Sequence, residues 1–137
     1  MIKTSLMILS FLLAVSAAAK AECSPHTMQG QYIFSARGFI EPLAPKVQRV
    51  HAGVFVFDGV ANVSGTETSS REGRIARGQK LKGKYTLNAD CTGTITFDSL
   101  ALPNLQTHWD LFATDGGSKA NMIRTDPGAM SIRSLER

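Results

Sequence analysis

Apolar and β-branched residues recur along the chain in runs of about eight to twelve residues, each followed by Gly, Asp, Asn or Pro. After residue 21, no stretch keeps the i, i+3, i+4, i+7 apolar spacing of an amphipathic helix for three turns. The pattern therefore predicts a series of β-strands. They span Gly30–Ile40, Gln48–Phe57, Val60–Ser70, Leu81–Leu87, Cys91–Leu100, Leu105–Thr114, Ser118–Thr125 and Ala129–Glu136.

The connections between these runs are mostly short. Asp58-Gly59 follows the second run and is typical of a type I′ hairpin turn, in which both central residues take positive φ. Segment 71–80, REGRIARGQK, is expected to connect the third run to the fourth. Eight sequential strands joined in this way favour an up-and-down barrel or a sandwich.

Glycines inside the strands favour the barrel. Gly38, Gly53, Gly65, Gly83 and Gly93 lie one in each of the first five strand runs. A glycine inside a strand marks a bend or a close approach of two backbones, and repeated bends are needed to close a sheet on itself. We therefore predict an all-β fold, a single small eight-stranded antiparallel β-barrel, with the sandwich as the alternative.

Side-chain alternation predicts which residues face the interior of the barrel. The inward set is Tyr32, Phe34, Phe55, Phe57, Ile95, Phe97, Trp109 and Leu111. His51 has the parity of Phe55 and Phe57, which places it in the lumen near one end. A barrel of this size is either filled by its own side chains or holds one small ligand, and the sequence leaves both interpretations open.

If the lumen holds a ligand, six residues are expected to contact it. They are Tyr32, His51, Phe55, Phe57, Asn62 and Trp109. The amide of Asn62 either presents a donor and an acceptor to the ligand or satisfies a backbone group across the hairpin.

The first 21 residues have the pattern of a secretory signal peptide. Lys3 precedes an apolar stretch from Leu6 to Val15, and Ala19-Lys20-Ala21 supplies the small residues of a cleavage site after Ala21. This stretch is about half the roughly 20 residues that span a bilayer, so no membrane span is predicted. The sequence therefore predicts a soluble periplasmic or secreted protein, with one domain formed by residues 22–137.

The two cysteines of the chain support this prediction. In an exported protein, Cys23 and Cys91 are expected to form a disulfide. The histidines show no zinc-type spacing against the cysteines, so neither a metal nor a cofactor is expected.

The charge of the chain and the pattern of its surface residues bear on possible binding partners. Loss of the signal peptide lowers the formal net charge from +4 to +2, too small an excess to favour nucleic-acid binding. The basic segment 71–84 either contacts an anionic surface or is a solvated hairpin that discourages edge pairing. Residues 54–57, VFVF, are apolar on both faces of their strand, which predicts a covering segment or a partner subunit in a homodimer.

Three motifs occur together along the chain. They are Phe55-x-Phe57-Asp58-Gly59-x-x-Asn62-x-Ser64-Gly65, the stretch YTLNADCTGT from Tyr85 to Thr94, and Thr125-Asp126-Pro127-Gly128. As a set they resemble a group of small exported bacterial proteins, mostly of unassigned function, that are similar to allene oxide cyclase-like, calycin-type barrels. The resemblance implies a small antiparallel barrel rather than an activity, because no local motif here matches the catalytic residues of the cyclases.

The expected function is therefore broad. The sequence predicts an exported barrel that binds a small apolar ligand or serves as a structural or interaction module. The alternative is a cyclase-like or isomerase-like enzyme that uses the lumen as a mould. Its acid–base groups would come from His51, Glu67, His108 and Asp110. An enzyme should have an open lumen with convergent polar groups, whereas a structural barrel should be filled by Phe and Leu.

Overall fold

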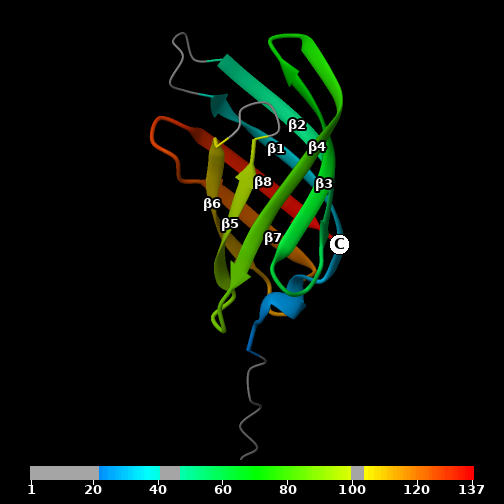
Figure 1. Cartoon of the computed structure of the whole chain (residues 1–137), viewed down its shortest axis with the longest axis vertical. Coiled ribbons are helices and arrows are strands. Elements are labelled where there is room, and N and C mark those ends of the chain that lie inside the picture. Colours follow the sequence, from blue (N-terminus) through cyan, green and yellow to red (C-terminus); the bar gives the residue numbers. More distant parts are fainter. Residues whose placement is uncertain (1–21, 41–46, 100–103) are drawn as a thin grey trace, which may run out of the picture.

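Eight antiparallel strands pair in chain order and close into a barrel (Figure 1). The structure is a computed structural model that describes residues 22–40, 47–99 and 104–137; the predicted signal peptide lies outside them. The elements are a 3-10 turn η1 (Pro25–Met28) and strands β1 (Gly30–Ile40), β2 (Val47–Phe57), β3 (Asn62–Arg71), β4 (Arg74–Leu87), β5 (Thr92–Asp98), β6 (Gln106–Ala113), β7 (Lys119–Arg124) and β8 (Met130–Glu136). Pairing of β1 with β8 closes the sheet, which confirms the barrel and excludes the sandwich.

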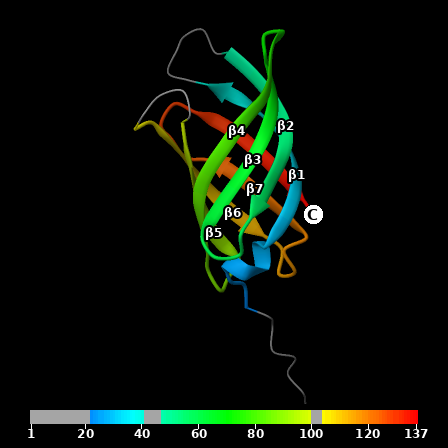
Figure 2. The same ribbon diagram turned by 45° about the vertical axis from the view of Figure 1, so that its right-hand side comes forward.

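The largest departure from the sequence prediction is the start of β4. This strand begins at Arg74 rather than Leu81, and its backbone pairs with β3 as far as Arg71↔Arg74. The resulting hairpin extends beyond the end of the barrel opposite η1 (Figure 2). Its basic side chains are exposed, so no buried apolar face marks it in the sequence; only the pairing with β3 reveals the strand.

The turn between β2 and β3 is also longer than the predicted two-residue type I′ turn. The Asp58 carboxylate accepts hydrogen bonds from the backbone N–H groups of Val60, Ala61 and Asn62 at 2.8–2.9 Å. These bonds hold the pKa of Asp58 well below its usual value. The side chain of Asp58 thus organises a wider loop, and β3 begins at Asn62 instead of Val60.

The five strand glycines lie where neighbouring backbones come too close for a side chain. A Cβ added at Gly53 would lie 2.0 Å from the carbonyl oxygen of Thr66 on β3, and one added at Gly65 would lie 2.3 Å from that of Val54 on β2. Gly38, Gly83 and Gly93 face adjacent strands at similar distances. The close backbone approach predicted for these glycines is confirmed.

One end of the barrel is closed by the N-terminal segment. Cys23 and Cys91 form the predicted disulfide, with Cα atoms 5.0 Å apart. Met28 of η1 is fully buried, and the Tyr85 hydroxyl donates a hydrogen bond of 2.8 Å to the Pro25 carbonyl. The disulfide and η1 therefore seal this end over a core of aromatic and aliphatic side chains.

The outer face of β2 is not covered by any described segment. Val56 is 45% exposed, and Ile33 of β1, which pairs with Val54, is 63% exposed. The covering segment is thus not found among the described residues, and the homodimer stays a prediction. In the same part of the chain, no helix is long and apolar enough to cross a membrane.

Candidate functional site

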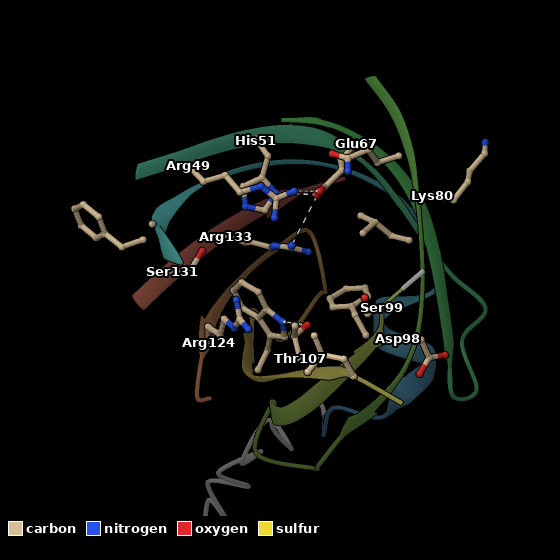
Figure 3. A pocket seen from close by; sticks show the side chains of 17 residues that line it. Arg49, His51, Glu67, Lys80, Asp98, Ser99, Thr107, Arg124, Ser131 and Arg133 are labelled. Carbon is tan, nitrogen blue, oxygen red and sulfur yellow. Dashed lines mark hydrogen bonds and ion pairs between the residues drawn. The ribbon is translucent and has the colours of Figure 1, made fainter. Parts of the chain in front are cut away.

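The lumen is hollow at the end opposite η1. A cavity of about 450 Å³ opens there, and its wall combines apolar and charged side chains (Figure 3). Phe97, Leu81 and Trp109 contribute apolar surface, whereas His51, Glu67 and Arg133 contribute polar groups. The barrel is therefore packed at one end and open at the other.

A buried carboxylate is the centre of the polar wall. Glu67 of β3 is 3% exposed, and it accepts hydrogen bonds from Arg49 Nη2 and from His51 Nδ1, the latter at 2.8 Å. Arg133 of β8 approaches the same carboxylate with Nη2 at 3.8 Å. Ala36 on β1 is the backbone partner of both His51 and Arg133, so a small side chain separates the two longer ones.

The guanidinium of Arg133 lies among aromatic rings. Its Cζ is 4.4 Å from the ring centroid of Trp109 and 5.1–5.4 Å from those of Phe97, Phe34 and Phe55. These distances fall within the range of cation–π attraction. Arg133 is only 4% exposed, and within the described part of the chain its buried Nε and Nη1 atoms have no hydrogen-bond partner.

The protonation states follow from burial and neighbouring charge. Burial lowers the pKa of Arg133 to about 9, which still leaves it a cation at neutral pH. Burial, together with the charges of Arg133 and Arg49, lowers the pKa of His51 although its hydrogen bond to Glu67 opposes this. Burial also acts to raise the pKa of Glu67, but His51 and the two arginines outweigh it and the net shift is downward. The four groups thus carry a net charge of +1 at neutral pH.

The pKa of His51 predicts a specific pH dependence of stability. The unfolded chain binds a proton at this histidine near its ordinary pKa of about 6.5, whereas the folded protein binds it only at lower pH. We therefore expect the free energy of unfolding to fall as the pH drops below about 6.5, by no more than about 1.4 kcal/mol per pH unit. Urea unfolding between pH 7.5 and 5.5 measures this, and His51→Gln should show a shallower slope. Equal slopes in the two proteins would contradict the assignment.

The residues predicted to contact a ligand are divided between different places. His51 and Trp109 line the cavity, and the buried ring of Phe55 lies beneath it, near Arg133. Tyr32 and Phe57 pack against each other at the closed end, with ring centroids 5.3 Å apart. The Tyr32 hydroxyl donates to the Gly117 carbonyl, so it is already satisfied without a ligand.

Three of the residues singled out from the sequence, Asn62, His108 and Asp110, face solvent instead of the lumen. Asn62 is exposed at the hairpin near η1, where its Nδ2 donates to Asp58 Oδ2 at 2.6 Å. This corrects the lumenal position and supports the structural alternative for the amide. His108 and Asp110 are exposed on β6, on either side of the inward Trp109, so neither can act on a group in the cavity.

Sequence reasoning missed the roles of Arg49 and Arg133 and did not place Glu67 in the lumen. A charged residue with the parity of buried neighbours is the available signal. Glu67 shares the face of Val63 and Gly65 on β3, and Arg133 shares the face of Leu135 on β8. This signal is weak when one strand is considered alone. An inward charged residue indicates a site only when its counter-ion is known to lie on a neighbouring strand.

The residue types in the cavity wall and their arrangement limit the chemistry that the site can perform. Among residues 22–40, 47–99 and 104–137, no group of three or more His, Cys, Asp or Glu residues could hold a metal ion. The fold and the cavity define a small antiparallel barrel with a ligand-sized opening at the end of the lumen opposite η1. Comparisons with protein families, with curated proteins and with solved structures found no match to this chain in any of the three.

Proposed function

We propose that this protein is an exported barrel that binds one small, largely apolar molecule in the open end of its lumen. The observation that carries the proposal is the cavity of about 450 Å³ above a fully packed closed end. Ligand pockets have volumes of about 300–1,000 Å³ and combine mostly apolar walls with a few polar groups. The cavity falls in this range of volume, and Trp109, Phe97 and Leu81 form an apolar part of its wall beside the polar groups around Glu67.

Export is part of the proposal. The N-terminal residues have the signal-peptide pattern, and the Cys23–Cys91 disulfide is compatible with an oxidising compartment. The motif set that resembles allene oxide cyclase-like barrels agrees with the small antiparallel barrel. Kinship with that group is likewise part of the proposal.

Native mass spectrometry of the protein purified from its own host tests ligand binding. We expect a retained mass in addition to that of the mature chain. Leu81→Trp, which fills part of the cavity, should lose this mass, whereas Lys82→Trp on the outer face of the same strand should keep it. The proposal is wrong if repeated preparations carry no ligand and no apolar compound binds saturably, or if both variants retain the mass equally.

One observation favours a second function, a cyclase-like or isomerase-like enzyme. His51 Nδ1 lies 2.8 Å from Glu67 Oε2 inside the cavity, and a carboxylate that orients a histidine is a common arrangement in general acid–base catalysis. With a retained ligand identified, conversion of that compound should require His51 while its binding does not. If His51→Gln binds the compound and no conversion is detected with either protein, the enzymatic alternative is wrong.

A further inference from the structure

Arg133 has an unused capacity to bind an anion. Guanidinium carries five N–H donors, and in Arg133 the Nε and Nη1 atoms account for three of them. Both atoms are buried and have no hydrogen-bond partner within the described part of the chain. Buried charged donors without partners cost free energy, so a complementary group in the cavity would stabilise this arrangement.

The charge of the site has the same implication. Glu67 is the single carboxylate of the cluster, and it is already engaged by Arg49 and His51 as well as by Arg133. Arg49 contacts it directly, whereas Arg133 Nη2 is 3.8 Å from it and outside ordinary hydrogen-bond distance. Among Arg49, His51, Glu67 and Arg133, one positive charge thus remains uncompensated, and Arg133 is the cation with the weaker contact.

The position of Arg133 in the cavity also restricts which ligands could bind. Arg133 reaches into the cavity between Glu67 on one side of the wall and Thr107 on the other (Figure 3). The ring of Trp109 lies 4.4 Å from its Cζ. The Trp109 Nε1 already donates to Thr107 Oγ1 at 3.1 Å, so its indole offers the ligand an apolar face. A molecule that approaches the guanidinium from the mouth would therefore have its body against rings and aliphatic side chains.

We infer that the ligand is a monocarboxylate with an apolar body, whose carboxylate pairs with Arg133 while its body lies along Trp109, Phe97 and Leu81. The inference rests on the proposed function and adds the charge and polarity of the ligand. Arginine suits this role because its planar guanidinium binds a carboxylate through two parallel hydrogen bonds. Glu67, whose Oε2 lies 3.8 Å from Arg133 Nη2 in the cavity wall, would repel a second negative charge on the ligand.

A matched series of compounds tests the inference. The probes are 4-phenylbutanoate, 4-phenylbutan-1-ol and 4-phenylbutylamine, with decanoate, decan-1-ol and decylamine as a second series and inorganic phosphate as an anion without an apolar body. The chain has one tryptophan, so fluorescence of Trp109 reports on the cavity directly. We expect each carboxylate to bind at least about tenfold more tightly than its alcohol, because a hydrogen bond between two charged groups is stronger than one to a neutral hydroxyl. The amines and phosphate should bind more weakly than the carboxylates.

Variants of two arginines in the cavity wall distinguish recognition from a structural role. Arg133→Met should abolish the preference for carboxylate over alcohol while the alcohol still binds. Arg133→Lys keeps the charge and should retain part of the preference. It replaces the methionine variant in this test if that variant does not fold. Arg124→Met is the control, because Arg124 already donates to Asp126 at 2.7 Å, and it should keep the preference.

Different results would overturn the carboxylate preference of the ligand and ligand binding itself. Alcohols that bind as tightly as carboxylates, or a preference that survives both Arg133 substitutions, would overturn the inference and leave ligand binding intact. If phosphate binds as tightly as the carboxylates, the inference that the ligand has an apolar body is wrong. If no compound of either series binds and natively purified protein carries no mass, ligand binding itself is overturned.

Discussion

Replacing Glu67 by leucine is expected to destabilise the folded protein by about 3–5 kcal/mol, the usual cost of leaving a buried ionic partner uncompensated. Glu67 is 3% exposed and is the carboxylate that faces Arg49, His51 and Arg133. Without it, Arg133 would remain 4% exposed with no counter-charge. The free energy of unfolding in urea, measured at pH 7.5, gives the loss.

Two controls show whether the loss comes from the buried charge. The double variant Glu67→Leu/Arg133→Leu should recover a large part of the stability, because removal of both partners of a buried pair is often close to neutral. Glu136→Ala removes an exposed pair with Lys119, whose side chains are 59% and 66% exposed, and should cost less than about 1 kcal/mol. A Glu67→Leu variant no less stable than Glu136→Ala would contradict the buried network.

Replacing both cysteines by alanine is expected to cost about 4 kcal/mol, the chain-entropy value for a loop as long as the one between Cys23 and Cys91. Their sequence separation is 68 residues. The loss should be concentrated at the closed end, because the disulfide ties down the segment that includes the fully buried Met28. Urea unfolding of the variant, compared with the oxidised wild-type protein, measures the effect.

The single variant Cys91→Ala provides the matched control. It breaks the same bridge, so it should be about as unstable as the double variant, and reduction of the wild-type protein with dithiothreitol should approach the same value. A double variant within about 1 kcal/mol of the oxidised protein would show that η1 and its contacts close the barrel without the disulfide.

The disulfide and the buried charges lie at opposite ends of one lumen, and the two ends are lined by different kinds of side chain. At the closed end, aromatic and aliphatic side chains such as Tyr32 and Phe57 fill the space. At the open end, Glu67 and Arg133 occupy the positions where a purely structural barrel would have Phe or Leu. Charged groups at these positions are costly to bury, so their presence supports a role in recognition more than in packing.

The strands that the sequence predicted best are those with a clear local pattern. β1 spans Gly30–Ile40 as predicted, because its alternation is regular and a Pro-containing segment follows it. That His51, Phe55 and Phe57 share one face of β2 was likewise correct, since alternation within one strand requires no knowledge of its neighbours. Which face is the inner one could not be read from VFVF, because both of its faces are apolar. The first half of β4 was missed because a strand with exposed charged side chains lacks that alternation.

Most of the candidate site could not be predicted in this way. Parity states that a side chain faces the lumen but not how far along the barrel it lies. The stagger between strands decides that depth, and it places Tyr32 and Phe57 at the closed end but His51 and Trp109 at the open end. Asn62 was placed wrongly because the Asp58 loop is wider than a two-residue turn.

By itself, the sequence determined the all-β class, the order of the strands, the glycines where backbones touch and the pairing of its two cysteines, because each depends on local pattern or on simple counting. Only the tertiary structure decided that Glu67 and Arg133, distant in the chain, meet across a hollow lumen. Their contact requires β8 to pair with β1, β1 with β2 and β2 with β3 in one register. Closure of the barrel is therefore the physical event that creates the charged cavity.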